Sequence, residues 1–139
     1  MSLRALLAAA LLAGTTLAAS AETLTVYTSQ PQDQMAAVIK AFNAEHPDIT
    51  VELFRSGPPE VMAKLQADQT AGTSPADVVL IADTVAMTQL KNAGRLYAFT
   101  DAPTAGINPA VIDKDRTYFG TKLITTGIVY NTNLVKTPP

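Results

Sequence analysis

Three short segments could bind a small ligand, because each places polar side chains directly after an apolar or β-prone run. They are Thr28-Ser29-Gln30, Ser56-Gly57 and Asp83-Thr84. A helical pattern follows each one, so each stands at a helix N-terminus, where unpaired N–H groups and partial positive charge favour an anion. Such side chains are also ordinary helix N-caps. The case for a binding site therefore depends on the three segments lying at one edge of a sheet.

Short strands are predicted before each of these segments. Residues 24–28 and 49–54 are β-prone, and 24–28 alternates along its length. Residues 77–82 form a continuous apolar run after the leading aspartate, typical of a parallel strand buried on both faces. Two further β-like stretches follow at 118–122 and 123–130. The strands thus alternate with helices over the first two thirds of the chain.

The helices follow from apolar spacing and from helix-breaking residues. The first is expected over 31–45, with one apolar face formed by Met35, Val38, Ile39 and Phe42. The second is expected between the turn at 56–60 and Gly72. The third is expected over 85–92, with Gly94 in the left-handed conformation that ends it.

The order strand-helix-strand-helix-strand-helix predicts a mostly parallel sheet flanked by helices, an α/β fold. Ligands of such sheets bind at the carboxyl ends of the strands. The Asp83 carboxylate would repel a simple anion, so an aminated anion, or a metal ion with an accompanying anion, would suit the three segments together. The single histidine, His46, is expected at the opposite end, so no catalytic residue is assigned.

Composition excludes several classes of protein. The 139 residues include no Cys and one His, which excludes a disulfide scaffold, a thiolate zinc site and a multi-histidine metal site. The net charge of −2 does not indicate nucleic acid as a partner. An apolar share of 47% with 16% charged residues predicts a globular chain. We expect no metal ligands of the protein's own and no cofactor.

The first 21 residues have the layout of a cleaved secretory signal peptide. Arg4 provides the positive charge, 5–17 is apolar, and Ala19-Ser20-Ala21 has the small-x-small pattern of a cleavage site. The apolar run is shorter than the roughly 20 residues that span a bilayer. The remaining chain is therefore expected in the periplasm.

Together with the export signal, three segments resemble the extracellular solute-binding proteins of ABC importers. The matching branch is the type II group that includes ferric-ion-binding proteins and binders of phosphonates. The segments are 24–29 (LTVYTS), 76–83 (ADVVLIAD) and 125–132 (TTGIVYNT).

The resemblance implies the first lobe of a two-lobed, hinged periplasmic-binding-protein-like II fold, with the second lobe missing. Residues 22–130 would form this lobe, and 131–139 would begin the crossover to the second. The implied function is to capture a small anion, a phosphonate or a ferric ion complex and deliver it to an ABC permease in the inner membrane. The protein is expected to be a monomer and not an enzyme.

The same resemblance implies the ligand contacts. Five positions match first-lobe contacts: Thr28, Ser29, Ser56, Gly57 and Asp83. Thr126 and Gly127 match the segment where the chain crosses between lobes, and a glycine there suits a hinge. Ferric binders often have a histidine just after the first strand, where this chain has Gln30-Pro31. They also use a tyrosine pair from the second lobe. The hydroxyl-rich loops therefore fit a phosphonate or another small anion better than iron alone.

Two classes of protein remain as alternatives. One is a truncated α/β hydrolase-type enzyme, for which no nucleophile–base pair is found. The other is a protein that binds no small molecule, either a fragment of a longer solute-binding protein or an interaction module with the same fold.

Overall fold

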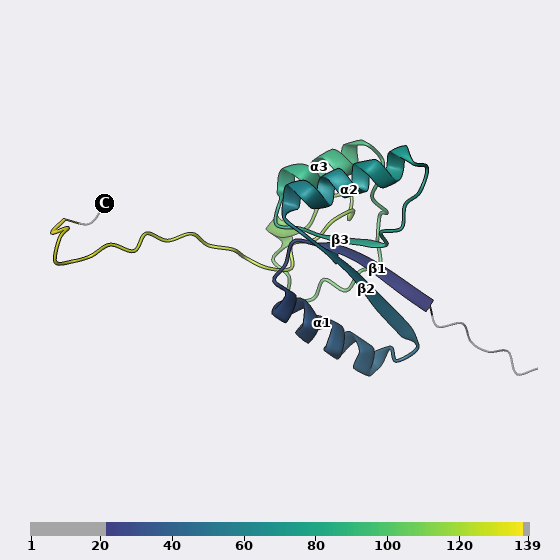
Figure 1. Cartoon of the computed structure of the whole chain (residues 1–139), viewed down its shortest axis with the longest axis horizontal. Coiled ribbons are helices and arrows are strands. Elements are labelled where there is room, and N and C mark those ends of the chain that lie inside the picture. The colour runs from purple at the N-terminus through teal and green to yellow at the C-terminus, as the bar shows by residue number, and fades with distance from the viewer. Residues whose placement is uncertain (1–21, 138–139) are drawn as a thin grey trace, which may run out of the picture. The chain divides into compact units, whose positions relative to one another are not determined.

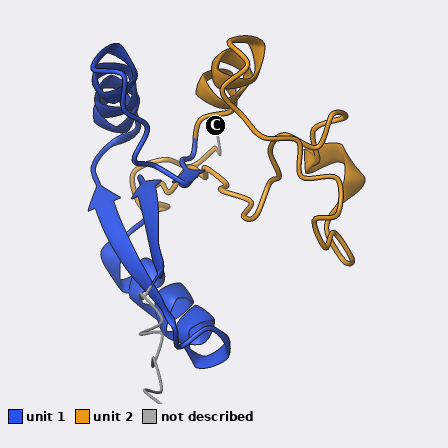
Figure 2. Cartoon of the chain, turned by 90° about the vertical axis from the view of Figure 1, so that its right-hand side faces the viewer, with its two compact units in different colours: residues 1–82 blue, residues 83–139 orange. Residues whose placement is uncertain are grey.

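The computed structural model describes residues 22–137, which fall into two compact units, residues 1–82 and 83–139 of the chain (Figure 2). The first unit contains a sheet and two helices. The second contains one helix followed by turns. The proposed signal peptide, 1–21, lies outside the described residues. None of the helices within 22–137 is long and apolar enough to cross a membrane.

The sheet of the first unit has three parallel strands in the order β2-β1-β3. They are β1 (Glu22–Thr28), β2 (Ile49–Arg55) and β3 (Val78–Leu80). The central strand, β1, becomes buried toward its carboxyl end, at Val26, Tyr27 and Thr28. This arrangement confirms the α/β class with a parallel sheet. It also confirms the first two predicted strands to within two residues at each end.

Two helices cover opposite faces of this sheet (Figure 1). They are α1 (Gln32–Glu45), which contacts β2, and α2 (Pro58–Thr70), which contacts β1. Met35 is buried on α1, but Val38 is exposed. The buried face of this helix is therefore narrower than the spacing of its apolar residues predicted. On α2, Val61 is completely buried and Leu65 is nearly so. These contacts hold the strand ends in place between two helices.

A polar cluster also fastens α2 to β1. The hydroxyl of Tyr27 donates to Asp68 Oδ2 at 2.8 Å, and Lys64 forms an ion pair with the other oxygen of Asp68. The Lys64 ammonium lies 5.4 Å from the centre of the Tyr27 ring. The hydrogen bond with Lys64 lowers the pKa of Asp68, and the same bond raises the pKa of Lys64. The cluster therefore holds opposite charges together beside a buried aromatic ring.

The third strand is shorter and more exposed than predicted. It spans three residues and lies at one edge of the three-stranded sheet. Val78 is 41% exposed, so the prediction of burial on both faces is wrong. Asp77 extends the pairing beyond the strand, because its N–H donates to the Thr25 carbonyl at 2.9 Å and its carboxylate accepts the Thr25 N–H at 2.8 Å.

The helix of the second unit is α3 (Thr84–Asn92), and both of its ends follow the sequence prediction. The Asp83 carboxylate caps its start. At its end, Gly94 has φ +66°. The Gly94 N–H donates to the Lys91 carbonyl and the Arg95 N–H to the Leu90 carbonyl, both at 2.9 Å. This is the Schellman pattern that terminates a helix with glycine.

A charged network organises the chain after α3. Lys91 Nζ lies 2.6 Å from Asp113 Oδ1 and 2.7 Å from Asp115 Oδ2. The Asp113 side chain is only 7% exposed and also accepts the Thr117 hydroxyl at 2.7 Å. Arg116 donates to the Ala102 carbonyl at 2.7 Å. Long-range partners therefore bury Asp113, while Lys114 and Asp115 in the turn that follows it are exposed.

The two β-like stretches after residue 117 do not form strands in the described part of the chain. A short 3₁₀ helix, η1 (Pro109–Val111), precedes them, and one isolated bridge pairs Ile112 with Phe119. Residues 121–129 are exposed, and Val129 is 99% exposed. A β-prone run forms a strand only when a neighbouring edge accepts its hydrogen bonds, and here no such edge pairs with it.

Candidate functional site

The carboxyl edge of the first unit's sheet brings two of the three predicted segments together. The Ser56 N–H donates to the Thr28 carbonyl at 3.1 Å, which joins the ends of β1 and β2. The Ser29 N–H donates to the Leu80 carbonyl at 3.1 Å, which joins the ends of β1 and β3. The prediction that these loops meet at one edge of a parallel sheet is correct for Thr28-Ser29 and Ser56-Gly57.

Thr28 lies beneath this edge and is completely buried. Its hydroxyl donates to the Leu80 carbonyl at 2.8 Å and accepts the Gln30 N–H at 3.0 Å. Both bonds are internal, so the hydroxyl could donate to a ligand only if its bond to the Leu80 carbonyl broke. We interpret Thr28 as the residue that fixes the loop.

Ser29 and Ser56 are the hydroxyls that this edge presents. Both are half-buried. The Ser29 Oγ accepts the Ala82 N–H at 3.2 Å, and within residues 22–137 no acceptor takes the proton of either serine. Both serines can therefore donate a hydrogen bond to an oxygen atom of a ligand.

Gly57 is the N-cap residue of α2, and this helix start offers fewer N–H donors than the prediction assumed. Positions one and two of the helix are Pro58 and Pro59, which have no N–H group. A Cβ on Gly57 would lie 2.5 Å from a carboxylate oxygen of Glu60, so the glycine makes room for that side chain. The start of α2 therefore combines few donors with a nearby negative charge.

Asp83 acts as the N-cap of α3. Its Oδ1 accepts the Ala86 N–H at 3.0 Å, and the half-buried carboxylate keeps its second oxygen outside this bond. It follows Ala82 directly in the chain. The structure thus shows Asp83 as a helix N-cap, and its contact with a ligand stays a prediction.

Thr126 and Gly127 belong to the second unit, where both are exposed in a segment without helix or strand. Open space surrounds Gly127, since a Cβ there would meet no atom within 4 Å. Their role at a hinge or a ligand site stays a prediction.

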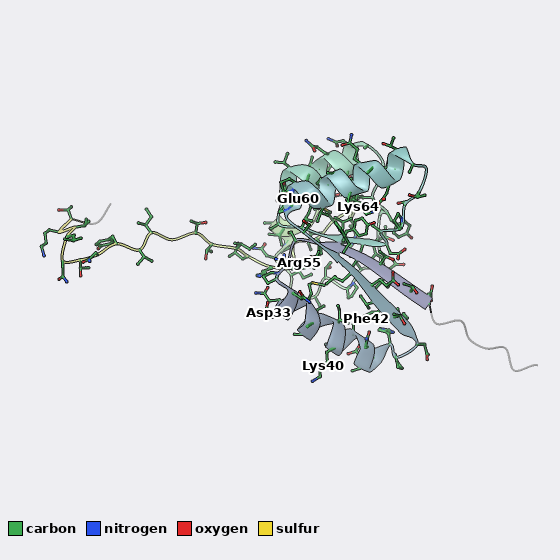
Figure 3. The ribbon with its side chains drawn as sticks, in the orientation of Figure 1. Asp33, Lys40, Phe42, Arg55, Glu60 and Lys64 are labelled. Carbon is green, nitrogen blue, oxygen red and sulfur yellow. The ribbon has the colours of Figure 1, made fainter. Side chains whose placement is uncertain are left out.

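Arg55 is the residue at this edge that the sequence reasoning missed. It is the last residue of β2, in register with Thr28, and its Nε donates to the Gln30 carbonyl at 3.1 Å. Within residues 22–137, its two terminal nitrogens form no ion pair and no hydrogen bond. The sequence did contain a signal for Arg55, namely its position directly before Ser56. The last residue of a strand lies at the same edge of the sheet as the loop that follows it. Figure 3 shows Arg55 at the end of the unit where α1 and α2 begin, near Asp33 and Glu60.

Across the part of the chain that the structure describes, no group of three or more His, Cys, Asp or Glu side chains could hold a metal ion. His46 is exposed just after the last residue of α1, and its ring lies 4.7 Å from that of Phe42. It therefore lies at the opposite end of the sheet from the two serines, as predicted.

A parallel sheet with polar loops at its carboxyl edge is the architecture of a ligand-binding α/β protein. The sequence model of the bacterial extracellular solute-binding protein family matches residues 28–139. The chain belongs to this family. Comparison with curated protein sequences gives no significant match.

A solved structure shows the same fold. The crystal structure of iron-bound HitA from Pseudomonas aeruginosa is similar with a TM-score of 0.59 and 24% sequence identity. The similarity covers 68% of this chain and 30% of the HitA chain, so this chain spans less than a third of that structure's length. At this level of identity the likeness establishes the fold.

Proposed function

We propose that the chain is the substrate-binding component of an ABC importer. It acts in the periplasm, after cleavage of residues 1–21, and captures a small anion, a phosphonate or a ferric ion complex for a permease in the inner membrane. The observation that supports this most directly is the pair of serine hydroxyls, Ser29 and Ser56, at the carboxyl edge of a sheet in a family of solute-binding proteins.

The ligand class follows from the donors at this edge. Ser29 and Ser56 donate from neutral hydroxyls, and Arg55 adds a positive charge beside them. Hydroxyl, guanidinium and backbone N–H groups suit an oxyanion. HitA was crystallised with iron, which keeps a ferric ion complex, in which an anion accompanies the metal, among the candidates. Phosphonate or another small anion remains the better fit.

The domain arrangement is part of the proposal. Residues 22–130 would belong to one lobe of a two-lobed protein, and residues 131–139 would lead toward the other. Two lobes that close on a ligand remove it from water, which strengthens every polar contact. The segment with Thr126 and Gly127 would then supply the second set of contacts.

Substitution separates this function from that of a hydrolase. We expect Ser29→Ala and Ser56→Ala to weaken binding of phosphate or 2-aminoethylphosphonate, measured by titration calorimetry, without any turnover of phosphate or carboxylate esters. Ser74→Ala is the matched control, because Ser74 is exposed in the loop before β3, at the other end of the sheet. Ester turnover that disappears in the serine variants would contradict the proposal and favour an enzyme.

A further inference from the structure

Arg55 differs from the other basic residues of the first unit in how it is held. Its Nε donates to the Gln30 carbonyl at 3.1 Å, which anchors the guanidinium to the loop between β1 and α1. Lys64 is neutralised by Asp68, and Lys40 lies farther along α1, away from the strand ends (Figure 3). Arg55 therefore combines a fixed position with a charge that no described acidic side chain pairs.

The strand geometry shows on which side of the edge this charge lies. Tyr27 and its register partner Phe54 face α2, because the Tyr27 hydroxyl bonds Asp68 of that helix. Successive side chains of a strand alternate between the two faces. Arg55 therefore faces α1, in agreement with its bond to the loop that opens this helix.

The start of α1 adds donors on the same side. The helix begins at Gln32 without a side-chain cap, and the backbone N–H groups of Gln32 and Asp33 have no acceptor within the helix. Asp33 and Glu60 are the acidic side chains of the first turns of α1 and α2, and neither forms an ion pair with Arg55 in the described chain. The guanidinium thus keeps the edge formed by its two terminal nitrogens for an incoming oxyanion.

We propose that Arg55 is the specificity-determining residue of the first unit, and that it selects ligands with an oxyanion group such as phosphate or phosphonate. This inference rests on the proposed function, and it narrows the ligand class. The anchored Nε leaves the terminal nitrogens for the oxyanion, while the hydroxyl of the next residue, Ser56, donates at the same edge. A planar guanidinium can donate two parallel bonds to one oxyanion, which a lysine ammonium cannot do with the same geometry.

The test is titration calorimetry of the chain and its variants with inorganic phosphate, 2-aminoethylphosphonate and putrescine. We expect Arg55→Gln to lower the affinity for both oxyanions by roughly tenfold or more, because a charge-assisted pair is lost. Arg55→Lys, which keeps the charge but loses the anchor, should recover only part of this affinity. Lys40→Gln removes the same charge from the exposed surface of α1 and should leave the affinity unchanged.

The outcomes distinguish the role of Arg55 from the proposed function of the whole chain. Equal oxyanion affinity of the wild-type chain and a folded Arg55→Gln variant would overturn the role of Arg55 while the proposed function stands. Binding of putrescine without either oxyanion would overturn the role of Arg55 and also the anionic ligand class of the proposed function. Binding of none of the three probes would overturn the inference, and binding of neither these probes nor Fe³⁺-citrate would contradict the proposed function. If Arg55→Gln does not fold, the loss of affinity in Arg55→Lys relative to Lys40→Gln gives the answer.

Discussion

The hydroxyl of Thr28 donates to the carbonyl of Leu80 at 2.8 Å, and this bond ties the end of β1 to the end of β3. The two residues are 52 positions apart in the chain. The same hydroxyl accepts the Gln30 N–H at 3.0 Å, so one buried side chain fixes both the strand ends and the loop that carries Ser29. The shape of the candidate site therefore depends on a residue that is itself inaccessible.

Replacing Thr28 with valine should destabilise the first unit. The change keeps the shape of the side chain but removes two partly buried hydrogen bonds, to the Leu80 carbonyl and from the Gln30 N–H, which together contribute about 1–3 kcal/mol. Urea denaturation followed by circular dichroism measures the difference. Thr23→Val is the control, because Thr23 is exposed on the same strand. Equal stability of the two variants would contradict the role assigned to Thr28.

The cap of α3 gives a second prediction. Asp83→Ala removes the acceptor of the Ala86 N–H and should lower the free energy of unfolding by about 1 kcal/mol. Asp83→Asn keeps an oxygen at this position and should lower the free energy of unfolding by only a few tenths of a kcal/mol. The pair separates the cap from the charge, since only the charge is lost in the asparagine variant. A similar loss of stability in both variants would show that the carboxylate does more than cap the helix.

The ionisation of Asp113 makes the second unit sensitive to acid. The hydrogen bond with Lys91 lowers the pKa of the Asp113 carboxyl from 3.8 to about 2. Because the folded state binds this proton less readily than the unfolded state, the contribution is complete above pH 3.8 and is lost as the pH falls toward 2. Lys91 has a raised pKa, so its own contribution is lost only in alkali.

The measurement is the urea midpoint at a series of pH values for the wild-type chain and Asp113→Asn. We expect the difference between the two to be largest near neutral pH and to shrink between pH 3.8 and about 2. A difference that stays constant over this range would show that the Asp113 carboxyl titrates normally.

Gly94 allows a test of backbone conformation alone. Its φ of +66° is unfavourable for any residue with a Cβ, and a Cβ there would meet no atom within 4 Å. Gly94→Ala should therefore cost about 1 kcal/mol through conformation and not through a clash. Gly127→Ala is matched, because that glycine also has open space but no positive φ. A loss of stability in both variants, measured by thermal unfolding, would contradict this explanation.

The parts of the fold that could be predicted are those that local patterns determine. The end of α1 followed from Pro47, and the end of α3 from Gly94, because these residues restrict the backbone whatever surrounds them. The strands at 118–130 were predicted wrongly, because β-propensity does not show whether a partner edge is present. The burial of Asp113 depends on Lys91, 22 residues earlier, and no local pattern indicates that partner.

The candidate site divides in the same way. Ser29 and Ser56 were found because loops after parallel strands meet at one edge of the sheet. The burial of Thr28 was not predicted, since it depends on β3 pairing with β1. Arg55 was overlooked because the predicted strand ended one residue too early, at Phe54, and its anchor is a backbone carbonyl of another loop.

The most direct test of the account is thermal unfolding of the chain from residue 22 with five probes. These are phosphate, 2-aminoethylphosphonate, a hexose phosphate, Fe³⁺-citrate and putrescine. A ligand at 100 times its Kd stabilises the folded state by about 2.7 kcal/mol, which raises the Tm by several degrees in a chain of this size. If the chain binds an oxyanion as proposed, we expect such a shift with at least one of the phosphate or phosphonate probes. A cooperative transition that none of the five probes moves would contradict it.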